Sequence, residues 1–344
     1  MPDRASAKRP LRERRPPGAA AASPAVPAGA RPASPTRATG GRTPAPQRLG
    51  VRKTYKLFIG GAFPRSESGR SYPVTGADGA LLAHAARASR KDARDAVTAA
   101  RAAFAAWSGA TAYNRGQVLY RVAELLDGRA AQFTAVSVQN EGLSAAEADR
   151  AVAAAIDRWV WYAGWPDKIA QVAGSANPVA GPYFNFSVPE PTGVVAVVAP
   201  AGSGLLGLVS VLAPVIASGN TAVVVASEAY PLAAITLAEV LATSDVPAGV
   251  VNVLTGFAAE LAPVLAGHMD VNAIDLTGVG AAGVGAAGVG AAGVGAAGRG
   301  ELERLAAGNL KRVFAADEDW AAPPSPRRML AFTEIKTVWH PVGI

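Results

Sequence analysis

Cysteine is absent from the whole chain of 344 residues. Disulfides, thiolate-bound metals and covalent catalysis by a thiol are therefore excluded for this sequence. Because structural disulfides belong mainly to oxidising compartments, the absence also fits a cytosolic protein. We accordingly expect a cytoplasmic location.

Charged residues are scarce as well, at 17% of the chain, against about a quarter in typical domains. Half of the residues are apolar, so we expect a well-buried α/β body. The formal net charge of +7 comes from residues 1–50, where ten Lys or Arg stand against Asp3 and Glu13, leaving −1 for residues 51–344. Nucleic-acid binding by the body is therefore not expected, and only the basic tail keeps that alternative open.

Segments typical of membrane association are missing. The N-terminus has no apolar stretch of the kind found in signal peptides. Residues 191–227 carry no charge, but glycine and proline divide them into pieces of strand and helix length. We therefore predict a buried strand–helix–strand segment here and no membrane span.

Composition divides the chain into four parts. Residues 1–50, rich in Pro, Ala and Arg, are predicted to be disordered, because they hold too few large apolar side chains to form a core. Residues 51–277 form the α/β body. Residues 278–299 consist mainly of four Gly-Val-Gly-Ala-Ala copies and are predicted to be a flexible linker, whose match to a dinucleotide fingerprint follows from its periodicity. Residues 300–344 are predicted to contain a strand at 332–339 and, before it, an amphipathic helix with Leu302, Leu305, Leu310 and Val313 on its apolar face.

The first part of the body is predicted to be helical. Helices begin at Ser89 and Ser144, each of which has an acidic residue three positions later, as in a capping box. A further helix is predicted between them at residues 114–132. Residues 183–188 alternate in the manner of a β-arm.

From Gly193 onward, valine-rich strands without alternation follow one another with helices between them. This pattern is typical of a parallel sheet that helices cover on both faces, with right-handed crossovers. The predicted fold class is α/β, a Rossmann-like doubly wound parallel sheet with N-terminal helices and a C-terminal oligomerisation strand. The predicted strands are 194–199, 222–226, 250–254 and 271–276, and the predicted helices between them are 205–217, 232–241 and 258–266.

The sequence offers few residues for metal binding or for stacking on nucleic-acid bases. The three histidines are isolated and show no metal-ligand spacing, so no metal site is predicted. Trp159, Trp161 and Trp165 have helical spacing without interleaved basic residues, which favours packing over base stacking.

Several separated motifs resemble the cofactor-binding half of the aldehyde dehydrogenases. They are residues 190–200, 213–221, Ser227-Glu228 and 247–256, with a further match in Glu334-Ile-Lys-Thr-Val-Trp339. The resemblance implies that residues 51–277 are a Rossmann-like domain for NAD(P). It places cofactor-binding positions at Pro200, Ser227, Glu228, Gly256, Thr277 and Gly278.

The chain also departs from this family. The family's cysteine nucleophile and general-base glutamate motif have no counterpart, and Gly202 stands where an asparagine helps to form the oxyanion hole. Val225 replaces the lysine that holds the adenosine ribose, and Val279 replaces a serine beside the pyrophosphate. Glu228 is kept, and either binds a ribose hydroxyl or serves as an acid at a helix start.

These losses predict a catalytically inactive protein that acts as a partner or scaffold subunit, with NAD(P) binding weak or lost. The alternative is the family-level activity, an NAD(P)-dependent oxidoreductase acting on aldehydes.

The C-terminal strand carries the prediction about assembly. Ile335 and Trp339 make one of its faces apolar, and a lone strand has unpaired backbone groups. The resemblance implies that this strand pairs between subunits. We therefore expect a homo-oligomer or a complex with a catalytic aldehyde dehydrogenase.

Overall fold

The computed structural model describes residues 51–279 and 298–343. The tail predicted at residues 1–50 and nearly all of the predicted linker lie outside these residues. Val51–Ile344 form one compact unit.

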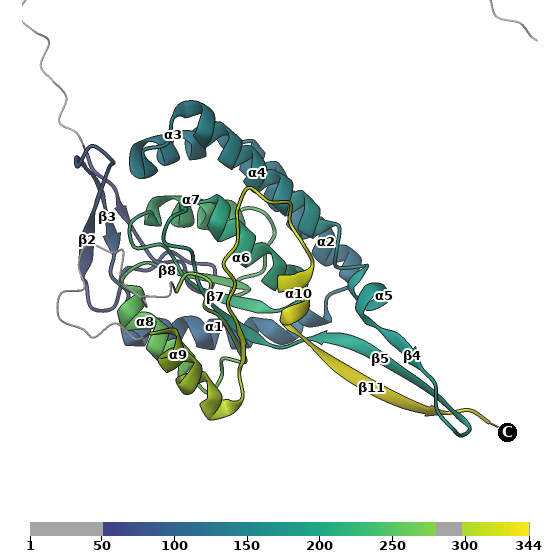
Figure 1. Cartoon of the computed structure of the whole chain (residues 1–344). Coiled ribbons are helices and arrows are strands. Elements are labelled where there is room, and N and C mark those ends of the chain that lie inside the picture. The colour runs from purple at the N-terminus through teal and green to yellow at the C-terminus, as the bar shows by residue number, and fades with distance from the viewer. Residues whose placement is uncertain (1–50, 280–297, 344) are drawn as a thin grey trace, which may run out of the picture. The chain divides into compact units, whose positions relative to one another are not determined.

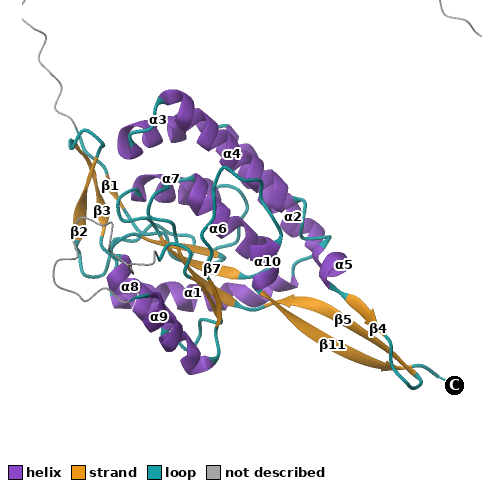
Figure 2. Ribbon diagram, in the orientation of Figure 1, coloured by secondary structure: helices purple, strands orange, loops and turns teal. Residues whose placement is uncertain are grey.

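A five-stranded parallel sheet forms the centre of this unit (Figure 2). Its strand order is β10-β9-β6-β7-β8, and every neighbouring pair is parallel. The doubly wound fold class is therefore confirmed, with each predicted strand boundary shifted by up to two residues. The strands are β6 (Val194–Val198), β7 (Thr221–Val225), β8 (Val251–Leu254), β9 (Ala273–Asp275) and β10 (Arg312–Phe314), and the connecting helices are α6 (Leu206–Ala217), α7 (Pro231–Leu241), α8 (Ala258–Ala266) and α9 (Arg299–Ala306).

Helices precede the sheet, and their starts follow the sequence signals. Ser89 and Ser144 both form the predicted capping boxes. The prediction of one continuous helix at 114–132 is wrong, because the chain turns at Gly128 and forms two helices in this region. The helices are α1 (Arg90–Gly109), α2 (Ala112–Asp127), α3 (Ala130–Glu141), α4 (Ala145–Ala163) and α5 (Ile169–Ala173).

Alternate residues of each central strand enter two different cores. Val195 and Val197 of β6 pack with side chains of α4, α6 and α7, whereas Val194 and Val198 pack with those of α1, α8 and α9. Burying a valine completely stabilises the fold by about 1.5–3 kcal/mol relative to leaving it exposed. Burial on both faces explains why these strands read as continuous apolar runs.

The C-terminal part differs from the prediction. Leu310 does not belong to an amphipathic helix: α9 ends at Ala306, and Leu310 is 91% exposed with a φ of 56°. Val313 lies in β10, a strand that the sequence analysis missed. With only three residues, β10 is too short to show a period, and its pairing with the edge of β9 decides its conformation.

Two smaller sheets flank the body. One consists of β1 (Thr54–Tyr55), β3 (Leu81–Ala86) and β2 (Ser71–Thr75), in that order. The other, which we call the arm, extends away from the body and consists of β4 (Ser175–Asn177), β5 (Tyr183–Pro191) and β11 (Thr333–Pro341) (Figure 1).

The arm corrects one expectation about the C-terminal strand. The family resemblance implies that this strand pairs with another subunit, but β11 pairs along its whole length with β5 of the same chain. The register runs antiparallel from Thr333 opposite Pro191 to Pro341 opposite Tyr183. A short helix, α10 (Arg327–Ala331), leads into β11. Within the described residues, no helix combines the length and apolar character needed to cross a bilayer.

Candidate functional site

The carboxyl ends of the parallel strands form the candidate site. The strand order reverses beside β6, because β7 and β8 continue to one side and β9 and β10 to the other. In doubly wound folds such a reversal opens a crevice in which ligands bind. All six residues proposed for cofactor binding lie on the connections that leave β6, β7, β8 and β9 at this edge.

The loop after β6 is fixed by side chains from neighbouring segments. Ser227 Oγ donates a hydrogen bond to the Ala201 carbonyl at 2.9 Å, and the backbone N–H of Tyr230 donates to Ser227 Oγ at 3.2 Å. Glu141, at the end of α3, accepts a hydrogen bond from the Gly204 N–H at 2.9 Å. Pro200, which begins this loop, is buried, whereas Ala201 is exposed. The loop is thus held in place while its tip faces solvent.

Glu228 lies just past the end of β7 and reaches the start of α8. Its Oε1 accepts a hydrogen bond from the Ala258 N–H at 2.7 Å, which caps that helix. Its Oε2 is buried and has no hydrogen-bond partner among the described residues. Burial raises the pKa of the Glu228 carboxyl above its usual range, the hydrogen bond from Ala258 opposes this shift, and the nearby charge of Glu260 adds to it.

Tyr72 approaches the same place from β2. Its hydroxyl is also buried without a partner among the described residues, and its ring lies 5.5 Å from that of Phe257. Burial, followed by the charge of Glu228, raises the pKa of this hydroxyl. Within residues 51–279 and 298–343, the Glu228 Oε2 atom and the Tyr72 hydroxyl are therefore two buried groups at the start of α8 that have no hydrogen-bond partner.

Gly256 has a packing role that only glycine can fill. Its φ is 135°, and a Cβ at this position would lie 3.0 Å from the Ala88 nitrogen. Any larger residue would push the chain before α1 away from the sheet.

Thr277 and Gly278 follow β9 beside the end of β6. The Gly278 N–H donates to the Val198 carbonyl at 3.0 Å, and a Cβ on Gly278 would collide with the Ala199 carbonyl. Thr277 Oγ1 accepts a hydrogen bond from Arg328 at 3.0 Å, so the hydroxyl is already engaged by the segment before β11.

A buried ion cluster beside Thr277 was missed by the sequence analysis. Arg328, 2% exposed in its side chain, pairs with the fully buried Asp275 and lies 2.8 Å from Glu318. Burial alone would lower the pKa of the Arg328 guanidinium, but the charges of Asp275 and Glu318 outweigh it, so the pKa is raised. An acid within the otherwise apolar run 273–276 was the signal, because a buried carboxylate needs a cationic partner.

Other predictions can be compared with the described residues. Trp159 is fully buried in the core, while Trp161 and Trp165 pack against it, as predicted. Val225, at the position of the missing lysine, is a buried core residue of β7. Across residues 51–279 and 298–343, no cluster of His, Cys, Asp or Glu has the arrangement of a metal site.

Comparisons with known proteins agree with this architecture. The chain matches the model of the aldehyde dehydrogenase family over residues 64–293. It is 37% identical over 172 residues to (Z)-2-((N-methylformamido)methylene)-5-hydroxybutyrolactone dehydrogenase of Acinetobacter baylyi, which covers 50% of this chain and 35% of that protein. It is 32% identical over 232 residues to retinal dehydrogenase 2 of Gallus gallus, covering 65% and 44% of the two chains.

A solved structure gives the same result. The NAD+ complex of an aldehyde dehydrogenase from Bacillus cereus superimposes with a TM-score of 0.69 at 26% identity, covering 76% of this chain and 50% of that one. The chain thus spans less than half the length of the two curated relatives named above. The match over most of the sequence, together with the doubly wound sheet, establishes that the chain belongs to the aldehyde dehydrogenase family.

Proposed function

We propose that the chain binds NAD(P) and serves NAD(P)-dependent oxidation of aldehydes as the dinucleotide-binding part of an oxidoreductase. Family membership supports this proposal, as do relatives that are named dehydrogenases and a solved neighbour that is an NAD+ complex. It corresponds to the alternative that the sequence analysis left open beside the inactive-scaffold interpretation.

One observation carries the proposal: the buried Glu228 Oε2 accepts no hydrogen bond from any residue that the structure describes. A buried acceptor in this state costs about 1–3 kcal/mol, and a ligand hydroxyl would remove that cost. A ribose hydroxyl is such a donor, and Glu228 lies at the strand edge where a doubly wound fold binds a dinucleotide. The residues present therefore fit the adenosine side of NAD(P).

The chain's own residues define what each part would do. Glu228 would accept the ribose hydroxyl, and Gly202, which has open space where a Cβ would stand, leaves room for a backbone approach to phosphates. The chemistry that NAD(P) supplies when bound is hydride acceptance. Without the lysine at position 225, we expect weaker binding than a complete site would give.

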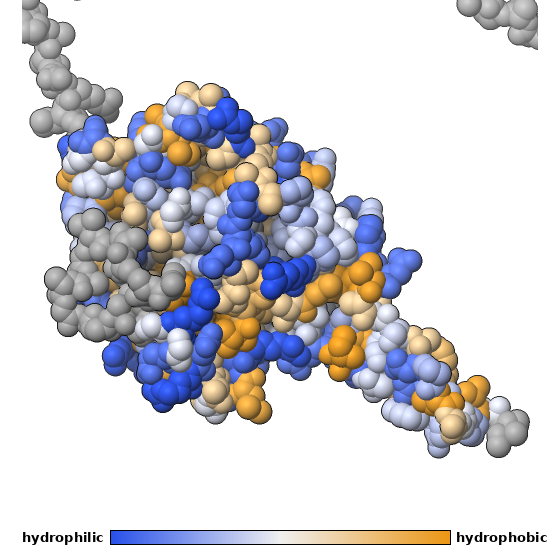
Figure 3. Space-filling model, viewed as in Figure 1, coloured by the Kyte–Doolittle hydropathy of each residue, from blue (hydrophilic) through white to orange (hydrophobic). Residues whose placement is uncertain are grey.

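Aldehyde oxidation needs a group that this chain does not contain. With no cysteine in the sequence, the nucleophile for a thiol-dependent reaction would have to come from outside these 344 residues. The arm favours association with a polypeptide that supplies this group, because it exposes Tyr183, Phe184, Ile335 and Trp339 at 46–58%. Figure 3 shows hydrophobic patches on the surface of the arm. The partner-subunit role predicted from the sequence is therefore compatible with the proposed function.

Calorimetric titration with NAD and NADP tests the binding proposal. We expect the Glu228→Gln variant to bind about tenfold more weakly than the parent protein, the effect of losing one hydrogen bond to a charged group. Glu124→Gln, an exposed change on α2, is the matched control and should leave binding unchanged. Equal binding by the Glu228 variant, or no binding by the parent at about 1 mM cofactor, contradicts the proposal.

Activity needs a separate measurement. The purified chain alone should not reduce NAD with simple aldehydes, because it has no thiol. Turnover by the isolated chain, after removal of contaminating dehydrogenases, would show that the reaction proceeds without the partner inferred above.

A further inference from the structure

A groove between the start of α1 and the side of α8 lies outside the cofactor site. It has a volume of 650 Å³, within the range of small-molecule sites. Its walls come from the loop before β2, the first turns of α1 and one face of α8. It is lined by Glu67, Arg70, Ala88, Ser89, Arg90, Lys91, Arg94, Ala259, Glu260, Pro263 and Val264.

The cations of this groove are placed where a helix disfavours them. Arg90 and Lys91 occupy the first turn of α1, although the N-terminus of a helix carries partial positive charge. Arg94 follows one turn after Arg90, and like charges at this spacing destabilise a helix by about 0.2–0.5 kcal/mol. Such a local conflict is expected at functional sites, and an anion in the groove would relieve it.

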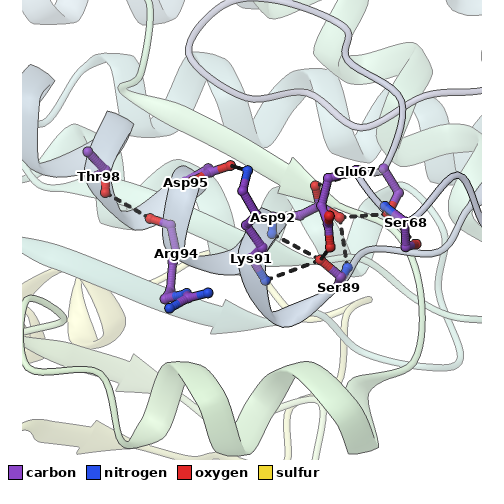
Figure 4. Close-up of polar contacts among 9 residues, drawn as sticks. Glu67, Ser68, Ser89, Lys91, Asp92, Arg94, Asp95 and Thr98 are labelled. Atoms are coloured by element: carbon purple, nitrogen blue, oxygen red, sulfur yellow. Dashed lines mark hydrogen bonds and ion pairs between the residues drawn. The ribbon is translucent and has the colours of Figure 1, made fainter.

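The carboxylates around the groove accept hydrogen bonds from neighbouring backbone and hydroxyl groups. Asp92 accepts hydrogen bonds from Ser66 Oγ at 2.7 Å, the Glu67 N–H at 3.1 Å and the Ser89 N–H at 2.8 Å. Glu67 Oε1 accepts one from Ser89 Oγ at 2.9 Å. Figure 4 shows Glu67, Ser89 and Asp92 gathered at the start of α1, with the side chain of Arg94 directed away from them.

The remaining charges in the groove do not balance. Glu260 is paired with Arg87, and Lys91 with Asp95 at 3.0 Å. The guanidinium groups of Arg70, Arg90 and Arg94 are exposed and make no hydrogen bond or ion pair with any residue in the described ranges. Donors without acceptors therefore face the groove from two walls.

The opposite wall limits what kind of anion fits. Ala259, Pro263 and Val264 of α8 are small or apolar, and no aromatic side chain lines the groove. Binding of single-stranded nucleic acid depends on aromatic stacking, so this lining does not favour it. Guanidinium groups on two walls of a space this large suit more than one phosphate, with room for an aliphatic portion against α8.

We propose that this groove binds the diphosphate group of a small aliphatic molecule, at a site separate from that of the cofactor. Arg90 and Arg94 hold the diphosphate from α1, and Arg70 closes on it from the loop before β2. The ligand neutralises the unfavourable charge at the start of α1. The site does not depend on Glu228, so this proposal and the proposed function can be tested independently of each other.

Titration of the full chain with inorganic pyrophosphate at low salt tests this proposal. Arg90→Gln and Arg94→Gln should each weaken pyrophosphate binding about tenfold, the loss expected for one charge-assisted contact. Arg150→Gln, an exposed change on α4, is the matched control and should bind like the parent. Glu228→Gln should also leave pyrophosphate binding unchanged, while NAD binding should be unaffected by the two arginine variants.

Four results overturn the proposal. Pyrophosphate affinity equal in the parent, Arg90→Gln and Arg94→Gln means that the anion binds elsewhere, as does an equal loss in Arg150→Gln. A parent protein that does not saturate at about 10 mM pyrophosphate has no such site. Tighter binding of a single-stranded oligonucleotide, lost in the same variants, assigns the groove to nucleic acid instead. Because Arg90 and Arg94 are exposed, both variants should keep the parent's circular dichroism spectrum, and Arg90→Lys provides a substitution that retains the charge.

Discussion

Every residue of β6 and β7 is buried, whereas Thr333 is the only buried residue of β11. The body covers both faces of its sheet with helices of the same chain. In the arm, β11 is exposed over most of its length, and its antiparallel pairing with β5 holds it in place. The difference separates residues that maintain the fold from residues that are available to another molecule.

The largest expected effect comes from the buried ion cluster of the body. Arg328→Met removes the partner of Asp275 and should lower the free energy of unfolding by about 3–5 kcal/mol, because a buried charge is left unpaired. Arg312→Met, at the exposed pair with Glu334, should change it by less than about 1 kcal/mol. Urea unfolding followed by circular dichroism measures both. A similar loss in the free energy of unfolding in the two variants would mean that burial does not make the Arg328–Asp275 pair more important for stability than the exposed Arg312–Glu334 pair.

A smaller effect is expected where the body meets the arm. Asn220 is fully buried, donates to the Phe332 carbonyl at 2.8 Å and accepts from the Gly193 N–H at 2.8 Å. Asn220→Ala leaves these groups without partners and should cost about 1–3 kcal/mol. Hydrogen exchange should then accelerate in β11 more than in β7. Uniform acceleration would show that Asn220 supports the body rather than the junction.

The smallest effect on stability is expected in the arm itself. The double variant Ile335→Ser and Trp339→Ser should change the free energy of unfolding by about 0.5 kcal/mol or less, since both side chains are more than half exposed. If the arm joins subunits, the same variant should lower the sedimentation coefficient. Val160→Ser, on the exposed side of α4, is the control for assembly. An unchanged assembly state, or a monomeric parent protein, would remove the arm from the partner proposal.

Local signals in the sequence were sufficient for much of the fold. The capping boxes at Ser89 and Ser144 and the valine-rich strands depend on neighbouring residues, and they were predicted within two residues of their positions. The pairing of Arg328 with Asp275 joins residues 53 positions apart, so a local pattern could indicate a buried acid but not which cation pairs with it. The short strand β10 likewise forms because β9 offers an edge.

The candidate site shows the same limit. The motifs located Glu228 and Thr277, but not what their side chains contact. Glu228 caps α8 through Ala258, and Thr277 accepts from Arg328. Both contacts depend on tertiary structure. The sequence could therefore identify these positions as candidates for cofactor binding, but it could not show which hydrogen bonds their side chains make.

The pairing of β5 with β11 has a consequence for synthesis of the protein. Ser187 and Thr337, which share a hydrogen bond across these strands, are 150 residues apart in the chain. At about 5–20 residues per second, a ribosome needs roughly 8–30 s to make the second strand after the first. During that interval β5 carries an open edge with Tyr183 and Phe184, so the nascent chain is most exposed to aggregation there, and a chaperone that shields this segment would raise the yield of folded protein.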